Sequence, residues 1–571
     1  MANPVDEVAR ILRAPAELFA SLLRDPIGTT TRLAGRTAVE AHAVATLLRA
    51  GVVGPEPPWR LAEIGRVLLE RGPMAAAPSL LAIRHGERAA LVDDLGSLTY
   101  AQIDQRAEAL AGAWQARGLR AGDGVGILCR NGRGLLGAVF ACTKLGARAL
   151  LLNTDFAAPQ AIEVCAREGA DAVVADADLF DIVAGVDAPR GRYVAWVDPS
   201  VPGSGPEGDG RIDDLIAGGE PLTTLRPDHD FSIVILTSGT TGTPKGANRA
   251  SVRSLSGPGA LLSKIPFRAG DVVYVAPPMF HAWGLANAAM ALALGGTVVT
   301  RRRFDPVQVW ADLAANHCTG LVAVPVMLNR LLGNDDAAGN PVLPDLRVVA
   351  VSGSQLEAPL ATRALDRFGP VLHNLYGSTE VAYATIATPD DLRAAPGSAG
   401  RPPFGVTVKV LGDDDVELPV GQIGRIFVAN EDQFSGYTGG GGKAMVDGLM
   451  ATGDVGHFDS GGRLWIDGRD DEMIVSGGEN VFPHEVEALL AGHPAVVEAA
   501  VVGVPDDEFG QRLQAYLVRT PGKKLTAATV KAYVRENLAR YKVPREVIFV
   551  DVLPRNPAGK VLKRVLVDQG G

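Results

Sequence analysis

The stretch Thr237-Ser-Gly-Thr-Thr-Gly-Thr-Pro-Lys-Gly-Ala247 decides the fold of this chain. It combines hydroxyl residues, glycines and one lysine, and it follows an apolar run at residues 231–236 that predicts a buried strand. Glycines let the backbone turn its amides toward an anion, hydroxyls add donors, and Lys245 adds a positive charge. The pattern predicts a polyphosphate-binding loop after a strand, followed by a polar turn and a helix from about Arg249. A Gly/Thr-rich surface turn is the structural alternative.

This stretch differs from the common P-loop, in which Gly, four residues and Gly-Lys-Ser/Thr follow one another. Pro244 precedes the lysine here, and Gly246 follows it. The run Gly439-Gly-Gly-Gly-Lys443 also falls short of the P-loop, because it ends in Ala444 and lacks a strand in front. We interpret residues 439–443 as a flexible turn.

Size and composition predict a soluble globular protein of two or more domains. Its 571 residues are too many for one simple core, and a hydrophobic content of 47% is typical of globular proteins. The net charge of −10 argues against a nucleic-acid partner, because such proteins usually present a basic face. With neither a signal peptide nor a membrane-spanning run in the sequence, we expect a cytoplasmic protein.

Cysteines and histidines are scattered along the chain. The four cysteines form no pair motif and predict buried, reduced thiols: Cys129, Cys142, Cys165 and Cys318. The nine histidines show no metal-ligand spacing.

Residues 1–78 predict several helical segments. Leu18, Phe19, Leu22 and Leu23 share one helix face, with arginines nearby. Such a helix can lie on a membrane surface, or it can dock on its own protein or on a partner subunit. Membrane contact and a homodimer therefore both stay open.

The remainder of the chain alternates between strand-like and helix-like segments. We expect strands at 124–128, 148–152, 170–175, 272–276, 297–300, 321–324 and 346–351. We expect helices at 98–117, 134–145 and 160–168, and a surface loop at 198–211. This alternation predicts a largely parallel sheet covered on both faces, with ligands at the carboxyl ends of its strands. From residue 485 onward, shorter segments predict a small α+β domain, with helices at 485–490 and 527–539 and strands at 496–502, 513–518 and 547–550.

Four motifs, in this order, resemble the adenylate-forming (ANL) superfamily of acyl- and aryl-CoA synthetases, peptide-synthetase adenylation domains and luciferases. They are residues 237–247, Asn374-Leu-Tyr-Gly-Ser-Thr-Glu380, Ala451-Thr-Gly-Asp454 with Asp467-Gly-Arg469, and Leu553-Pro-Arg-Asn-Pro-Ala-Gly-Lys560. The resemblance covers about residues 80–566, and the motifs are most similar to those of actinobacterial fatty-acyl-CoA synthetases. It implies a helical extension at 1–78, an AMP-binding α/β domain at 79–468, and a small mobile α+β domain at 469–571.

The resemblance implies where ATP is held. The phosphate-loop residues would bind the β- and γ-phosphates: Thr237, Ser238, Gly239, Thr240, Thr241, Gly242 and Lys245. Gly353 and Ser354, within Val351-Ser-Gly-Ser-Gln-Leu356, would lie against adenine, although the family more often has a small residue and proline where Ser354 and Gln355 stand. Asp454 and Arg469 would contact the ribose.

The resemblance also assigns the reacting centre. Tyr376 and Gly377 would lie near adenine, Thr379 would donate to the α-phosphate, and Glu380 with Thr240 would hold Mg²⁺, a hard cation that prefers oxygen ligands. Lys560 would be the mobile catalytic lysine, whose point charge suits attack on an α-phosphate.

The acyl pocket is implied by Pro278-Met-Phe-His-Ala-Trp-Gly284. Phe280, His281 and Trp283 would line it, and His281 would move with the reaction stage and act in catalysis. Residues 276–296 contain no acid that could neutralise an ammonium group, so an amino-acid substrate is not expected. Gly377 stands where acetate-type relatives have tryptophan, and we expect it to leave room for a longer acyl group.

The stretch after Gly468 resembles the family hinge and the loop that follows it. Asp471 stands at the pivot position, and Ser476, Gly477 and Gly478 would form part of the CoA tunnel. The expected function is a two-step fatty-acid–CoA ligase that uses ATP, Mg²⁺ and CoA. A fatty acyl-AMP ligase that loads a carrier protein, an aryl-acid CoA ligase, and a non-catalytic lipid- or nucleotide-binding relative are the alternatives.

Overall fold

The computed structural model describes residues 26–52, 56–198, 208–237, 245–248, 255–334, 339, 341–434, 436–438, 440–476, 479–506, 510–557 and 559–569, with side chains from residue 37 on. The predicted site residues 238–242, 477 and 478, and the predicted helix around Leu18, lie outside this range. For Thr237, Lys245, Asp471 and Ser476 the description is limited to the backbone.

A six-stranded sheet carries the phosphate loop. Its strand order is β6-β5-β3-β4-β7-β8, and β7 and the four strands before it pair in parallel. The bounds are β3 Gly124–Leu128, β4 Arg148–Leu151, β5 Ala170–Ala175, β6 Arg192–Val194, β7 Ser232–Thr237 and β8 Lys245–Asn248. All five residues of β3 are buried, as expected for a strand covered on both faces.

Strand β8 was not expected, since the sequence indicated a polar turn after the phosphate loop. The helix expected from about Arg249 follows as α10 Ser256–Lys264, and residues 249–254 lie outside the described range. Residues 245–248 pair antiparallel with β7, so that Thr237 lies opposite Lys245. The predicted phosphate loop therefore connects two strands of a hairpin. The unpaired edge of β7 explains this arrangement, since its backbone groups need partners.

A second, eight-stranded sheet has the order β14-β13-β12-β11-β9-β10-β1-β2, parallel except for an antiparallel strand at each edge. Its strands are β1 Ala89–Asp93, β2 Gly96–Thr99, β9 Val272–Val275, β10 Thr297–Val299, β11 Gly320–Ala323, β12 Val348–Val351, β13 Leu372–Tyr376 and β14 Thr385–Ala387. The predicted strands 272–276, 297–300, 321–324 and 346–351 are thereby confirmed.

Helices cover both sheets, as the alternation predicted. They are α5 Tyr100–Ala116, α6 Arg133–Leu145, α7 Ala158–Glu168, α8 Phe180–Val183, α9 Ile212–Gly218, α10 Ser256–Lys264, α11 Ala282–Ala293, α12 Pro306–Ala315, α13 Pro325–Gly333, α14 Ala358–Phe368 and α15 Pro389–Ala394, with the 3₁₀ turn η1 Ala177–Leu179. The start of α5 is set by a capping box, in which the Thr99 hydroxyl accepts from the Gln102 amide and the Gln102 side chain bonds back. The predicted α/β class is confirmed.

A third, antiparallel sheet was not predicted. It contains β15 Thr407–Leu411, β16 Gly424–Ala429, β17 Met445–Val446, β18 Leu449–Phe458 and β19 Leu464–Arg469. Its strands read poorly in the sequence because β16, β18 and β19 bury only part of their residues and alternate irregularly.

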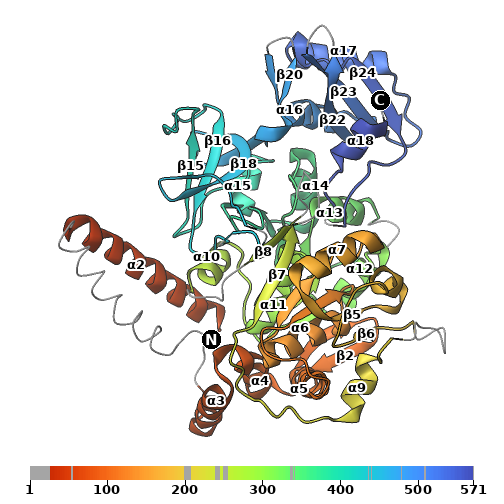
Figure 1. Ribbon diagram of the computed structural model, residues 1–571. Helices are drawn as coiled ribbons and strands as arrows, with labels where there is room; N and C mark the ends of the chain where they lie inside the picture. The colour runs from red at the N-terminus through yellow and green to blue at the C-terminus, as the bar shows by residue number, and fades with distance from the viewer. Residues whose placement is uncertain are drawn as a thin grey trace.

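The carboxyl-terminal elements form a separate lobe at the top of Figure 1. They are the 3₁₀ turn η2 Asp470–Glu472, β20 Ile474–Ser476, β21 Glu479–Val481, α16 Pro483–Ala491, β22 Val496–Asp506, β23 Gly510–Arg519, α17 Ala527–Asn537, η3 Arg540–Lys542, β24 Glu546–Val550 and α18 Lys563–Gln569. The two helices and three strands predicted between 485 and 550 are confirmed, and the small domain has its own sheet and hydrophobic core.

Three helices precede the first sheet: α2 Pro26–Ala50, α3 Pro58–Arg71 and α4 Pro73–His85. Figure 1 shows α2 extending away from the body beside α10. The boundary expected at residue 78 lies within α4. The fully buried Lys144 of α6 donates to Ser79 of α4 at 2.9 Å and pairs with Asp104 and Glu108 of α5 at 2.8 and 2.6 Å. Among the described residues, no helix has the length and apolar character needed to cross a membrane.

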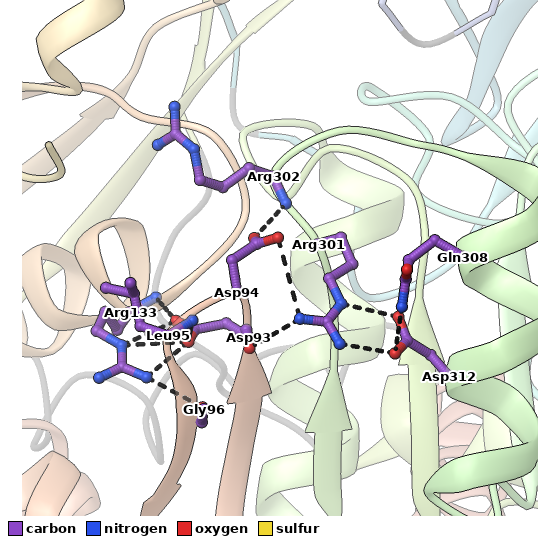
Figure 2. Close-up of polar contacts among 9 residues, drawn as sticks. All are labelled: Asp93, Asp94, Leu95, Gly96, Arg133, Arg301, Arg302, Gln308 and Asp312. Atoms are coloured by element: carbon purple, nitrogen blue, oxygen red, sulfur yellow. Dashed lines mark hydrogen bonds and ion pairs between the residues drawn. The ribbon is translucent and has the colours of Figure 1, made fainter. Parts of the chain in front are cut away.

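Figure 2 shows how ion pairs join the two large sheets where β1 and β10 end. Arg133 of α6 pairs with Asp93 of β1 at 2.6 Å. Arg301, which follows β10, pairs with Asp312 of α12 at 2.6 Å and donates to the Asp93 carbonyl at 3.0 Å. The network fixes the end of strand β1 against helices from both sheets.

A cavity of about 1110 Å³ opens beside this network, and Asp178, Trp196 and Arg302 are among its lining residues. Arg302 stacks on Trp196 at 3.4 Å and pairs with Asp176 and Asp178 at 2.6 and 2.9 Å. Its charge is therefore neutralised inside the protein, and none of the predicted site residues that the structure describes lines this cavity.

The four cysteines are buried free thiols, as predicted. Burial raises the pKa of both Cys165 and Cys318 to about 12, so neither sulfur is a thiolate at neutral pH.

Candidate functional site

The buried carboxylate of Asp454 lies where three predicted motifs meet. Its Oδ2 accepts from the Tyr376 hydroxyl at 2.6 Å, and its Oδ1 accepts from Arg469 at 3.1 Å. Burial raises the pKa of Asp454. The charge of Arg469, the hydrogen bond from Tyr376 and the charge of Lys560 act in the opposite direction and lower that pKa. Burial also raises the pKa of Tyr376 well above its usual range, and Asp454 adds to that effect. Tyr376 therefore stays protonated and donates.

Asp454 lies on strand β18, close to strands on either side. Strand β18 pairs with β16 on one side and with β19 on the other, and Asp454 stands opposite Arg469. Gly453 has a φ of +84°, which gives the strand a local bend that a residue with a side chain adopts poorly. The register between β16 and β18 shifts here, between the pairs Arg425–Val455 and Phe427–Ala451, so the Thr-Gly-Asp segment forms a bulge in β18.

Gly377 has a backbone role besides the pocket role that we expected for it. A Cβ at this position would lie 2.2 Å from the Ala382 carbonyl oxygen and 2.8 Å from the Cα of Tyr383. The chain folds back on itself here, so glycine is needed for close backbone passage. This close passage is one reason for glycine at position 377, and the expected room for a longer acyl group stays a prediction.

Glu380 follows on the same loop and is held by a residue that the sequence analysis missed. Its Oε1 accepts from the Tyr437 hydroxyl at 2.9 Å, and its carbonyl accepts from the Phe434 amide at 2.9 Å. Burial and the Glu380 carboxylate raise the pKa of Tyr437 to about 12. The carboxylate is thus held in one orientation while still half-buried. Thr379 beside it is also half-buried.

The segment around Tyr437 also contacts the phosphate-loop hairpin. The Thr438 amide donates to the Gly246 carbonyl at 2.9 Å, and its hydroxyl donates to the buried Glu168 of α7 at 2.9 Å. A Cβ at Gly246 would lie 2.7 Å from the Thr438 hydroxyl and 2.8 Å from a Val234 methyl. The hairpin is therefore packed between its own sheet and residues 436–438.

His281 immediately precedes α11. Its ring lies beside that of Phe280, with 4.5 Å between the ring centroids. Its Nε2 is buried, with no hydrogen-bond partner among the described residues. Burial lowers the pKa of His281 to about 4, so the ring is neutral at physiological pH. Phe280 is buried, and the Trp283 indole donates to the Ala323 carbonyl at 3.0 Å.

Lys560 lies on a tight turn of the small domain that rests against the large domain. Its amide donates to the Asn556 side chain at 2.8 Å, and Arg555 donates to the Gly559 carbonyl at 2.6 Å. A Cβ at Gly559 would meet Val326 at 2.5 Å. Because Val326 belongs to α13, at the carboxyl end of β11, the turn carrying Lys560 is seated on that edge of the eight-stranded sheet.

The predicted adenine loop follows β12. Gly353 has a φ of +95° and is exposed, and Ser354 beside it is half-buried. Gln355 was not among the predicted site residues. Its amide nitrogen lies 3.3 Å from the Ile466 carbonyl oxygen and 2.7 Å from Nε2 of His484.

Lys443 was interpreted as part of a flexible turn, yet its ammonium lies beside the Asp454 strand. Its Nζ is 3.4 Å from the Thr452 carbonyl oxygen and 3.4 Å from where a Gly453 Cβ would be. Tyr437 lies in none of the quoted motifs, and the motifs that contain Gln355 and Lys443 did not indicate these contacts, which arise only on folding.

The comparisons with known proteins agree with this geometry. Residues 81–438 match the model of the AMP-binding enzyme family, and residues 485–560 match its carboxyl-terminal domain. An indoleacetate–CoA ligase of Aromatoleum aromaticum is 34% identical over 85% of this chain and 94% of its own. A long-chain-fatty-acid–CoA ligase of Mycobacterium tuberculosis is 31% identical over 83% of this chain and 93% of its own.

Among solved structures, o-succinylbenzoate CoA synthetase of Bacillus subtilis, in complex with its acyl-adenylate intermediate, superposes with a TM-score of 0.74 and 27% identity. It covers 86% of this chain and 98% of its own. With both family domains matched in order, this chain belongs to the AMP-binding enzymes of the adenylate-forming superfamily.

Proposed function

We propose that this protein is an AMP-forming acid–CoA ligase. The observation that carries the proposal is the convergence of Tyr376, Arg469 and the Lys560 turn on the buried Asp454, in a chain of the AMP-binding family. An aromatic ring, a carboxylate and cations in one place suit a nucleotide, which presents a base, ribose hydroxyls and phosphates.

In the first step a carboxylate oxygen of the acid attacks the α-phosphorus of ATP. The bond from that phosphorus to the β-phosphate oxygen breaks, which gives acyl-AMP and pyrophosphate. Thr237, Lys245 and the loop between them hold the β- and γ-phosphates, while Thr379 and Lys560 stabilise charge at the α-phosphate. Asp454 and Arg469 hold the ribose, and Gly353, Ser354 and Tyr376 hold the adenine.

Glu380 is the proposed Mg²⁺ ligand, with Thr240 as its partner. A hard carboxylate oxygen suits this ion, and the Tyr437 hydroxyl fixes the carboxylate orientation at 2.9 Å. When bound, the ion neutralises phosphate charge.

In the second step the small domain turns about Asp471, and Ser476, Gly477 and Gly478 approach the adenylate. The CoA sulfur attacks the acyl carbon, the bond to the AMP oxygen breaks, and AMP leaves. The proposed domains are a helical extension at 1–78, the AMP-binding part at 79–468 and the mobile part at 469–571. The proposed location is the cytoplasm, with membrane contact and homodimer formation as further possibilities to test.

The proposed acid is a medium- or long-chain fatty acid or a similar apolar acid. The acid would meet uncharged side chains, those of Phe280, Trp283 and the neutral His281. Residues 276–296 contain no acidic side chain. A fatty-acid ligase lies among the relatives. An aryl acid is an equal candidate, because the indoleacetate ligase is similarly related.

A panel of acids tests the proposal by AMP release. Fatty acids of increasing length, indoleacetate, a cinnamate-type acid and an amino acid would each be supplied with Mg-ATP, with and without CoA. We expect acid-dependent release of AMP that requires CoA, and none with the amino acid. Adenylate that accumulates and ignores CoA would indicate a carrier-protein acceptor, and no acid-dependent pyrophosphate exchange would contradict an enzymatic role.

The Lys560 assignment has its own test. Lys560→Ala should lose acyl-adenylate formation by about a hundredfold or more, as expected when a charge at the reacting centre is removed. Conversion of supplied acyl-adenylate to thioester should change far less. Equal losses in both half-reactions would contradict the role.

A further inference from the structure

A polar contact crosses from the predicted adenine loop to the small domain. Gln355 follows β12 in the large domain, and His484 lies on α16, beyond the proposed pivot. Their side-chain nitrogens are 2.7 Å apart. Nδ1 of His484 lies 3.8 Å from Oε1 of Glu357, which precedes α14.

The chemistry of the Gln355 amide fixes the direction of this contact. Its nitrogen has two N–H groups, which can reach the Ile466 carbonyl at 3.3 Å and the His484 Nε2 at 2.7 Å. The imidazole then accepts at Nε2 and carries its proton on Nδ1, which faces the Glu357 carboxylate. A reversed amide would instead bring its oxygen close to the Ile466 oxygen, which is unfavourable.

The two ends of the contact lie on opposite sides of the turn Asp470–Glu472. Gln355, Glu357 and Ile466 precede that turn, and His484 follows it. A rotation about Asp471 must therefore separate His484 from Gln355, whereas the Gln355–Ile466 contact survives. The side chain of His484 is 18% exposed, so the bond is formed largely away from water.

The same orientation of the small domain seats the Lys560 turn on the large domain. Gly559 lies against Val326, and the charge of Lys560 is felt at Asp454. The Gln355–His484 contact and the placement of Lys560 therefore exist together in one orientation.

We propose that Gln355 and His484 form an interdomain latch that positions the small domain for acyl-adenylate formation. The latch acts through Lys560, so both are positioning residues, and the inference rests on the proposed two-step function.

Half-reaction kinetics on the full-length protein test the latch. Gln355→Leu and His484→Leu should each slow acid-dependent pyrophosphate exchange by roughly 3- to 10-fold, the effect of one hydrogen bond. Consumption of supplied acyl-adenylate by CoA should stay unchanged or become faster. The double variant should be no slower than either single variant, because both remove one contact. His484→Gln, which keeps an acceptor, should retain most of the exchange rate.

His493→Leu is the matched control. His493 accepts from the Ala495 amide at 3.1 Å and packs on Tyr533, both within the small domain. Its loss should leave the ratio of the two half-reactions unchanged. Equal slowing of both steps by His484→Leu, or additive losses in the double variant, would overturn the latch.

A measurement without turnover separates the latch from the proposed function. Amide hydrogen exchange in β19 and η2 should be faster in His484→Leu than in the wild type or in His493→Leu. If no acid supports pyrophosphate exchange in the wild type, the proposed function fails, and the amide hydrogen-exchange rates still decide whether the latch holds. Unchanged amide hydrogen exchange in His484→Leu would refute the latch.

Discussion

At the scale of single residues, the site depends on buried groups whose protonation is set by their surroundings. Asp454 is largely buried, and Tyr376 and Arg469 supply the hydrogen bonds that its carboxylate needs away from water. His281 is neutral because burial disfavours its charge. These states follow from packing, and no sequence motif reports them.

Gly377 provides a direct test at this scale. Gly377→Ala should reduce kcat/KM by on the order of tenfold, because overpacking costs about 1–3 kcal/mol and displaces the loop that carries Thr379 and Glu380. The loss should be similar for short and long acids in the panel. A loss of kcat/KM confined to long acids would instead support the prediction that Gly377 leaves room for a longer acyl group.

His373 on β13 links burial to pH. Burial lowers its pKa to about 4, although a bond to the Lys264 carbonyl opposes the shift. Its unfolded pKa is near 6.5, so the unfolded chain binds more protons between these values. The stability contribution is therefore complete above pH 6.5 and is lost as the pH falls toward 4, by on the order of 3 kcal/mol.

Thermal denaturation of His373→Gln from pH 7.5 to 4.5 checks this. Between pH 6.5 and 4.5 its melting temperature should fall less steeply than that of the wild type. His229→Gln, at an exposed position, should keep the wild-type slope. Parallel curves for all three proteins would contradict the role of His373.

At the scale of elements, the phosphate-loop hairpin and the helices of the amino-terminal extension owe their positions to contacts with other elements. Strand β8 is held by Thr438, which lies between β16 and β17 and bonds to Gly246 and to Glu168 of α7. Helix α4 is held by Lys144 of α6. Neither association follows from local propensity, since it joins elements far apart in the chain.

Lys144→Ala should release α3 and α4 from the body. It leaves Asp104 and Glu108 partly unpaired beside Ser79, and removal of one partner of a buried ion pair costs about 3–5 kcal/mol. Faster proteolysis within residues 56–85 and a lower melting temperature are the measurements. Arg66→Ala, which breaks an exposed pair with Glu70, should change the melting temperature little. Equal effects of the two substitutions on the melting temperature and on proteolysis would contradict the role of Lys144.

At the scale of the whole molecule, the small domain lies with the Lys560 turn seated on the large domain and with His484 against Gln355. The short turn Asp470–Glu472 is the covalent connection between the two parts. A single short connection suits a domain that rotates between two half-reactions.

Asp471→Pro tests that rotation. Proline fixes φ and stiffens the turn, so acyl-adenylate formation should be retained while thioester formation from supplied adenylate falls. The two half-reactions, measured separately, provide the readout. Thioester formation at the wild-type rate would count against rotation about this residue.

The sequence by itself determined the family, the α/β class, the order of the motifs and most strands and helices. These features are local: apolar periodicity, and short motifs such as Asn374–Glu380 in which neighbouring residues act together. The tertiary structure decided which residues complete the site. Tyr376 and Asp454 are 78 positions apart, and Gln355 and His484 are 129 apart. It also decided that Gly377 serves the backbone and that residues 245–248 form a strand. Such contacts arise when separate elements pack, so their energies depend on distances that local patterns do not encode.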